Sequence, residues 1–129
     1  GITLRDGKDI TIIATGLLVQ EAVKAAKALE AAGIDARVLD IHTIKPLDTE
    51  LVLKAAQETG RIVVAEEHNV IGGLGEAVSS YLSEVCPTPV TKIGIYDEFG
   101  HSGPAVDLLK EFGLSAENIE ATVKKVLGK

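Results

Sequence analysis

Hydrophobic and polar positions follow two different periods along this chain, and the change of period separates strands from helices. Short runs of aliphatic and β-branched residues, apolar at nearly every position, predict strands that are buried on both faces. The Asp6-Gly7 pair after the first run is typical of a tight turn, so we expect a hairpin that makes the first strand antiparallel. The predicted strands cover residues 2–4, 10–15, 36–41, 61–66 and 90–96.

Between these strands, apolar positions recur every three or four residues, which predicts amphipathic helices. In the first of them, Leu18, Ala22 and Leu29 fall on one apolar stripe. Asp48 and Ser115 stand where a side-chain oxygen can cap the first turn of a helix. The predicted helices cover residues 18–32, 49–58, 76–85, 105–112 and 116–127.

The alternation of strands and helices predicts an α/β fold. Right-handed crossovers then give a three-layer α/β/α arrangement with a mostly parallel, five-stranded sheet whose first strand is antiparallel. The 129 residues are the usual size of one domain, so we expect residues 1–129 to form a single domain. Hydrophobic residues make up 46% of the chain and aromatic residues 3%, which indicates a core of Ala, Val, Leu and Ile.

Charge and composition exclude several classes of partner. The chain has 13 Lys and Arg against 19 Asp and Glu, with no basic run, so we expect neither nucleic acid nor a membrane as a partner. No apolar stretch approaches the ~20 residues of a membrane span. A lone Cys86 without an internal partner is typical of the cytoplasm. Because the sequence contains no Met, we expect a piece of a larger protein.

A glycine-rich turn between a strand and a helix is the strongest candidate for a binding site. Free N–H groups at such a helix start can hold an anion, so we identify a possible anion or regulator site at His68, Gly72, Gly73 and Gly75. The alternative is a purely structural turn whose glycines allow a helix to pack closely on a strand. Glu76 adds a negative charge to the first helical turn, and we therefore favour the structural interpretation.

Other chemistry finds little support in the sequence. His42, His68 and His101 each follow a predicted strand, but a metal site needs at least three converging ligands, and we predict no metal site. The chain has no G-x-S-x-G nucleophile elbow and no phosphate-binding G-x-x-x-x-G-K-[ST] loop. The residues alone thus predict no catalytic group.

A series of short segments, in a fixed order, nevertheless resembles a known family, the C-terminal domains of transketolases. The resemblance extends along nearly the whole chain. The segments are I-A-T-G at 13–16, T-I-K-P-L-D at 43–48, E-E-H at 66–68, G-G-L-G-E-A-V at 72–78, F-G-H-S-G at 99–103, L-L-K-E-F-G-L at 108–114 and N-I at 118–119. Deoxyxylulose-phosphate synthases are similar in K-P-L-D and in D-E-F at 97–99, and the β subunits of 2-oxo acid dehydrogenases share the fold.

The resemblance implies a role inside a larger enzyme. Transketolases are dimers that use thiamine diphosphate and a divalent cation such as Mg²⁺ to move a two-carbon ketol unit between sugar phosphates. Their diphosphate- and pyrimidine-binding domains hold the cofactor, and these domains are either fused to the C-terminal domain or carried by a separate subunit. We therefore expect no catalytic and no cofactor-binding residue in this chain.

This chain is accordingly expected to be inactive alone and to support assembly or regulation of a cytoplasmic, homodimeric enzyme of the pentose phosphate pathway. Its expected partners are the diphosphate- and pyrimidine-binding domains. The alternative is the C-terminal domain of a deoxyxylulose-phosphate synthase, or of a 2-oxo acid dehydrogenase β subunit that acts as a partner-binding module.

Overall fold

The computed structural model describes residues 1–41, 46–69, 73–95 and 115–129, without the side chains of residues 67–69 and 95. Five strands form one sheet in the order β1-β3-β2-β4-β5, in which β1 is antiparallel and the others are parallel. The strands are β1 (Ile2–Arg5), β2 (Ile10–Ala14), β3 (Ala36–Asp40), β4 (Ile62–Asn69) and β5 (Val90–Ile95). The helices are α1 (Leu18–Ala31), α2 (Thr49–Thr59), α3 (Leu74–Val85) and α5 (Ala116–Leu127).

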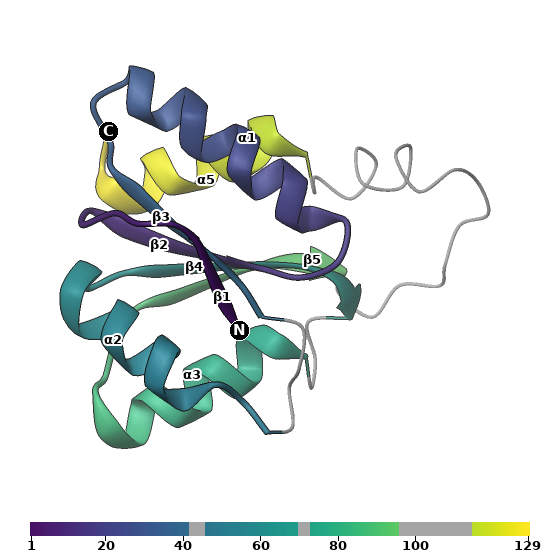
Figure 1. Ribbon diagram of the computed structural model, residues 1–129, viewed down its shortest axis with the longest axis vertical. Coiled ribbons are helices and arrows are strands. Elements are labelled where there is room, and N and C mark those ends of the chain that lie inside the picture. Colours follow the sequence, from purple (N-terminus) through teal and green to yellow (C-terminus); the bar gives the residue numbers. More distant parts are fainter. Residues whose placement is uncertain (42–45, 70–72, 96–114) are drawn as a thin grey trace.

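The helices cover the two faces of the sheet in pairs, α1 with α5 and α2 with α3 (Figure 1). Alternate residues of each strand therefore enter two separate cores. Ile12 and Val63 belong to the core under α1 and α5, whereas Ile13 and Val64 belong to the core over α2 and α3. The predicted α/β fold with three layers and a mostly parallel sheet is confirmed.

The predicted hairpin between the first two strands is wrong. β1 pairs with β3, with Ile2 opposite Asp40, so β3 lies between β1 and β2. The physical reason lies at Gly7, which does not have a positive φ. A Cβ on Gly7 would come within 2.5 Å of the carbonyl carbon of Ala36, so this glycine allows the chain to pass closely over the start of β3. The antiparallel direction of the first strand is confirmed.

The helix boundaries largely follow the sequence signals. Asp48 accepts a hydrogen bond from the Leu51 N–H at 3.2 Å, and Ser115 accepts one from the Asn118 N–H at 3.4 Å, so both predicted caps are confirmed. β4 runs three residues beyond its predicted end, to Asn69, and α3 begins two residues before its predicted start, at Leu74. The predicted helix at 105–112 lies outside the described residues.

Candidate functional site

The predicted anion or regulator site lies where β4 leads into α3. His68 is in β4 itself rather than after it, Gly73 is the N-cap position of α3, and Gly75 is in the first turn of that helix. Gly72 lies outside the described residues, as does the side chain of His68. The structure thus places Gly73 and Gly75 together at the start of a helix, as the sequence indicated.

An internal carboxylate occupies the N-terminus of α3. Glu66 is only 1% exposed, and its two carboxylate oxygens each accept a backbone hydrogen bond. Oε1 accepts from the Leu74 N–H at 2.9 Å, and Oε2 accepts from the Gly75 N–H at 2.8 Å. Both bonds are charge-assisted, and the negative charge lies at the positive end of the helix dipole. Two of the helix's first N–H groups are therefore satisfied by the chain itself.

Gly75 makes this arrangement possible because a side chain there would meet its neighbours. A Cβ on Gly75 would lie 2.8 Å from Cγ of Lys92 and 3.1 Å from Oε2 of Glu66. The aliphatic stem of Lys92, on β5, thus packs directly over the first turn of α3. The glycine serves the close packing of a strand on a helix, which is the structural interpretation made from the sequence. The anion site at His68, Gly72, Gly73 and Gly75 stays a prediction, in which the Gly75 N–H already donates to Glu66.

Sequence reasoning missed the role of Glu66, although a signal for it exists. The residue ends an otherwise apolar run, and it shares the strand face of Ile62 and Val64, which are fully buried against α2 and α3. An acid at a buried position needs strong hydrogen-bond donors nearby. The helix start eight residues later offers such donors.

Across the described residues, no group of three or more His, Cys, Asp or Glu side chains could hold a metal ion. His42 and His101 lie outside this part of the chain. Also within the described ranges, every helix is too short or too polar to cross a bilayer.

A pair of opposite charges lies at the N-terminal end of α2. Asp48 Oδ2 lies 3.1 Å from the Gly1 ammonium, while Oδ1 accepts the Leu51 N–H. The hydrogen bond from the ammonium and the one from Leu51 lower the pKa of Asp48 below its ordinary value. A hollow of about 370 Å³ beside this pair is bounded by Ile41 and Leu47.

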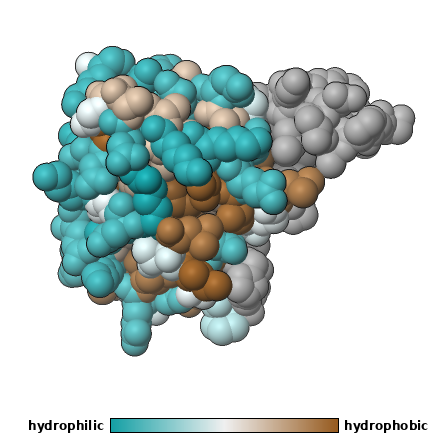
Figure 2. Space-filling view, turned by 45° about the horizontal axis from the view of Figure 1, so that its top comes forward, coloured by the Kyte–Doolittle hydropathy of each residue, from teal (hydrophilic) through white to brown (hydrophobic). Residues whose placement is uncertain are grey.

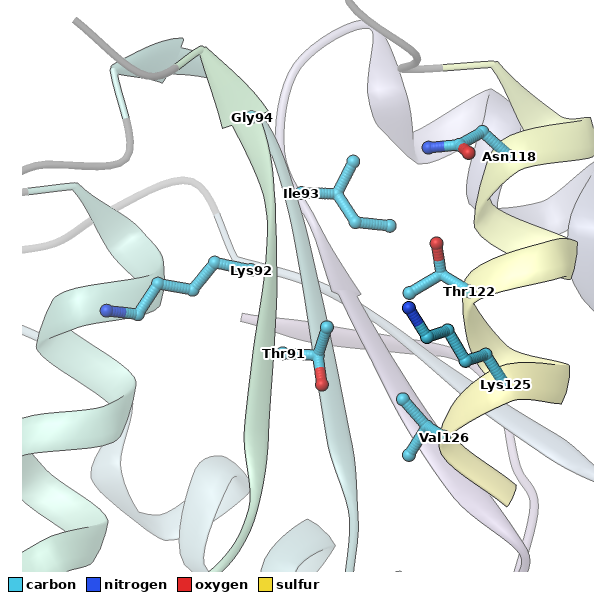
Figure 3. A pocket seen from close by; sticks show the side chains of 8 residues that line it. All are labelled: Thr91, Lys92, Ile93, Gly94, Asn118, Thr122, Lys125 and Val126. Carbon is cyan, nitrogen blue, oxygen red and sulfur yellow. The ribbon is translucent and has the colours of Figure 1, made fainter. Parts of the chain in front are cut away.

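A larger groove of about 480 Å³ runs between β5 and α5 (Figure 3). Thr91 and Ile93 project from β5 toward α5, whereas the side chain of Lys92 projects to the other side of the strand. The described residues that line the groove are Thr91, Lys92, Ile93, Gly94, Asn118, Thr122, Lys125 and Val126.

The surface also carries some exposed apolar side chains. Figure 2 shows one face on which hydrophobic residues gather in an area surrounded by hydrophilic ones. Ile2 and Leu4 of the edge strand β1 are 56% and 45% exposed, and Leu17 and Val85 are about half exposed. Exposed hydrophobic patches of this kind mark contacts with other proteins when they are large enough.

Comparison with known proteins identifies the family. Residues 1–119 match the family described as transketolase, C-terminal domain. The chain is 47% identical over 123 residues to the 6-deoxy-6-sulfo-D-fructose transketolase subunit SqwH of Clostridium sp. (strain MSTE9), covering 95% of this chain and 38% of that protein. It is also 47% identical to one of the subunits of an apulose-4-phosphate transketolase from Phocaeicola vulgatus, covering 98% of this chain and 40% of that protein.

A wider group of enzymes is also similar. The 1-deoxy-D-xylulose-5-phosphate synthase of Heliobacterium modesticaldum is 43% identical, covering 98% of this chain and 20% of that protein. Among solved structures, a chain described as a split gene transketolase, inactive beta4 tetramer, superposes with a TM-score of 0.90 at 49% identity. The match covers 98% of this chain and 41% of the other, so this chain spans about two fifths of such transketolase subunits. The chain therefore belongs to the family of transketolase C-terminal domains.

Proposed function

We propose that this chain is the C-terminal domain of a transketolase that transfers a two-carbon ketol unit between sugar phosphates. The observation that carries the proposal is the match to a split transketolase chain at a TM-score of 0.90 and 49% identity. Thiamine diphosphate and Mg²⁺ would be held by the diphosphate- and pyrimidine-binding domains, either fused to this domain or on a separate subunit. The complete enzyme would be a cytoplasmic homodimer of the pentose phosphate pathway.

Within that enzyme, residues 1–129 would form one domain whose role is assembly. The exposed Ile2 and Leu4 on β1 support this role, because an edge strand with apolar side chains is suited to packing against another domain. This domain contributes no catalytic residue under the proposal.

A reconstitution assay tests the proposal. The 129-residue chain would be mixed with thiamine diphosphate, Mg²⁺ and a ketose phosphate with an aldose phosphate acceptor, and ketol transfer would be measured. We expect no turnover by this chain alone, and turnover when a polypeptide with the diphosphate- and pyrimidine-binding domains is added. Turnover by the chain alone would contradict the assignment of catalysis to the other domains.

The choice of substrate is a second question for the same assay. The names of two relatives point to 6-deoxy-6-sulfo-D-fructose and apulose 4-phosphate as donors to compare with ordinary ketose phosphates. The 43% identity to a 1-deoxy-D-xylulose-5-phosphate synthase supports one alternative, in which the enzyme makes that product. With pyruvate as the donor and glyceraldehyde 3-phosphate as the acceptor, formation of 1-deoxy-D-xylulose 5-phosphate and CO2 without ketol transfer would favour the alternative.

The glycine turn is proposed as a site for a phosphate-bearing regulator, and NMR can test it. Inorganic phosphate would be titrated into ¹⁵N-labelled protein while the amide signals of Gly72, Gly73 and His68 are followed. The Gly75 amide serves as the internal reference, because its N–H already donates to Glu66. Shifts confined to the first three amides would support a site, and no shift at millimolar phosphate would leave the turn purely structural.

A further inference from the structure

The start of the chain is held in place by the first turn of helix α2. The Gly1 nitrogen lies 3.1 Å from Oδ2 of Asp48, whose Oδ1 accepts the Leu51 N–H. A Cβ on Gly1 would lie 3.0 Å from Cδ2 of Leu51 and 3.3 Å from Cγ1 of Ile41, so these side chains pack closely around the glycine. Figure 1 marks this end of the chain beside the helices α2 and α3. The path by which the backbone enters β1 is therefore fixed by packing as well as by charge.

The open hollow of about 370 Å³ adjoins this point. Its described lining residues are Gly1, Ile41, Pro46, Leu47 and Asp48, of which three carry apolar side chains. Ile41 is 2% exposed and belongs to the core of α2 and α3, and Leu47 packs against that core from outside. The hollow thus gives access to apolar surface at the rim of the interior. Such a surface is suited to an apolar side chain from a neighbouring segment.

In a longer polypeptide, the segment that passes this hollow is the one before Gly1. The chain matches a C-terminal domain and spans about two fifths of the transketolase subunits to which it is similar. Consecutive Cα atoms are about 3.8 Å apart, so a residue joined to Gly1 lies beside the hollow whatever its identity. The peptide bond turns the Gly1 ammonium into an amide, and the N–H of that amide can still donate to Asp48. Extension of the chain removes the positive charge but keeps the donor.

We propose that the two residues before Gly1 in the complete polypeptide dock in this hollow, with an apolar side chain against Ile41 and Leu47. Asp48 then binds two segments at once, the start of α2 through the Leu51 N–H and the start of β1 through the Gly1 N–H. This contact fixes the direction in which the preceding domain joins the present one. The inference rests on the proposed function, because it requires a preceding domain. Its tests measure stability and exchange rather than ketol transfer, so the two can fail separately.

N-terminal extensions of the 129-residue chain test the docking directly. Acetylated Ser-Ser-Leu-Leu and Ser-Ser-Ser-Ser would each be joined to Gly1, and the two proteins compared by urea unfolding. We expect the leucine extension to lower the unfolding equilibrium constant at least about fivefold relative to the serine extension, the order expected for half-burying one leucine side chain. Equal constants overturn the proposal. A difference that grows with protein concentration overturns it as well, because the leucines would then be joining two copies.

Two leucine truncations locate the effect. Leu47→Ala removes part of the apolar wall and should reduce the difference between the two extensions from about fivefold to about twofold. Leu17→Ala is an equal truncation of a half-exposed leucine at the start of α1, on the other face of the sheet, and should leave the difference unchanged. Equal reductions in the two variants, or none in Leu47→Ala, would refute the proposal.

Hydrogen exchange at the Gly1 amide tests the role of Asp48. In the ¹⁵N-labelled leucine extension, the Gly1 proton should exchange slowly, and Asp48→Ala should accelerate its exchange at least about tenfold, the order expected for one hydrogen bond to a charged group. Asp48→Asn retains an acceptor oxygen and should keep most of the protection. Exchange of the Gly1 proton as fast as in an unstructured peptide would show that Asp48 does not bind the entering chain, and the proposal would fail.

Discussion

Helices α2 and α3 both begin at a carboxylate, but the two carboxylates come from different distances along the chain. Asp48 lies three residues before the Leu51 N–H that it accepts, and its side chain is 34% exposed. Glu66 lies eight and nine residues before the N–H groups of Leu74 and Gly75, and it is 1% exposed. The first cap stabilises a helix end, whereas the second fastens a helix to a strand in the interior. The comparison shows that the same chemistry serves local structure at one site and tertiary packing at the other.

The largest effect is expected from removing the buried cap. Glu66→Ala leaves the Leu74 and Gly75 N–H groups without their acceptor and opens space in the core, so it should lower the free energy of unfolding by about 3 kcal/mol. Glu66→Gln preserves the shape and one good acceptor and should cost less. Urea unfolding followed by circular dichroism measures both. A loss below about 1 kcal/mol for Glu66→Ala would show that the buried cap is no stronger than an ordinary exposed one.

The packing that surrounds the buried cap gives the next effect. Gly75→Ala places a Cβ 2.8 Å from Cγ of Lys92, so the Lys92 side chain or the helix must shift, at a cost of about 1–3 kcal/mol. Lys92→Ala removes the obstructing stem, so the double variant should recover part of the loss. A double-mutant cycle of unfolding free energies isolates this coupling from any other role of Lys92. If the losses of unfolding free energy in Gly75→Ala and Lys92→Ala simply add, the contact with Lys92 does not explain why position 75 is a glycine.

The partly exposed cap at Asp48 should matter less. Asp48→Ala removes the acceptor for the Leu51 N–H and the partner of the Gly1 ammonium, with an expected loss of about 1 kcal/mol. Asp48→Asn retains a capping oxygen and should lie close to the parent protein near neutral pH. Measuring both in the same urea series as Glu66→Ala puts the two caps on one scale. A loss for Asp48→Ala that equals that of Glu66→Ala would remove the distinction between them.

These two caps also explain what the sequence could and could not predict. Helices, their caps and most strands follow from periodicity and from residues within four positions, which is why Asp48 and Ser115 were identified. The neighbour of β1 depends on the close passage of Gly7 over Ala36, a contact between distant residues, and the hairpin prediction was therefore wrong. At the candidate site, the sequence located the glycine turn. No neighbouring residue, however, distinguishes Glu66 from the adjacent Glu67 as the residue that caps helix α3. The alternation of buried faces along β4 makes that distinction, and it depends on the packed helices.

The smallest effect is the pH dependence of the partly exposed cap, Asp48. The Gly1 ammonium and the Leu51 N–H lower the folded-state pKa of Asp48 below its ordinary value of 3.8. A lowered folded pKa means that the unfolded state binds the proton more tightly, so the stability that Asp48 provides is complete above about pH 3.8. It is lost as the pH falls from there through the lower folded pKa. Solvent screening at a one-third exposed side chain keeps the change small.

Unfolding free energies of the parent chain and Asp48→Asn, measured between neutral pH and about pH 2, should therefore converge as the pH falls through this window. Extending or acetylating the N-terminus removes the ammonium charge and should raise the pKa of Asp48 toward its ordinary value, which moves the convergence to higher pH. Parallel curves for the two proteins at every pH would contradict the prediction, because they would show that folding does not lower the pKa of Asp48. If acetylation leaves the convergence where it is, the hydrogen bond from Leu51 alone lowers the pKa of Asp48.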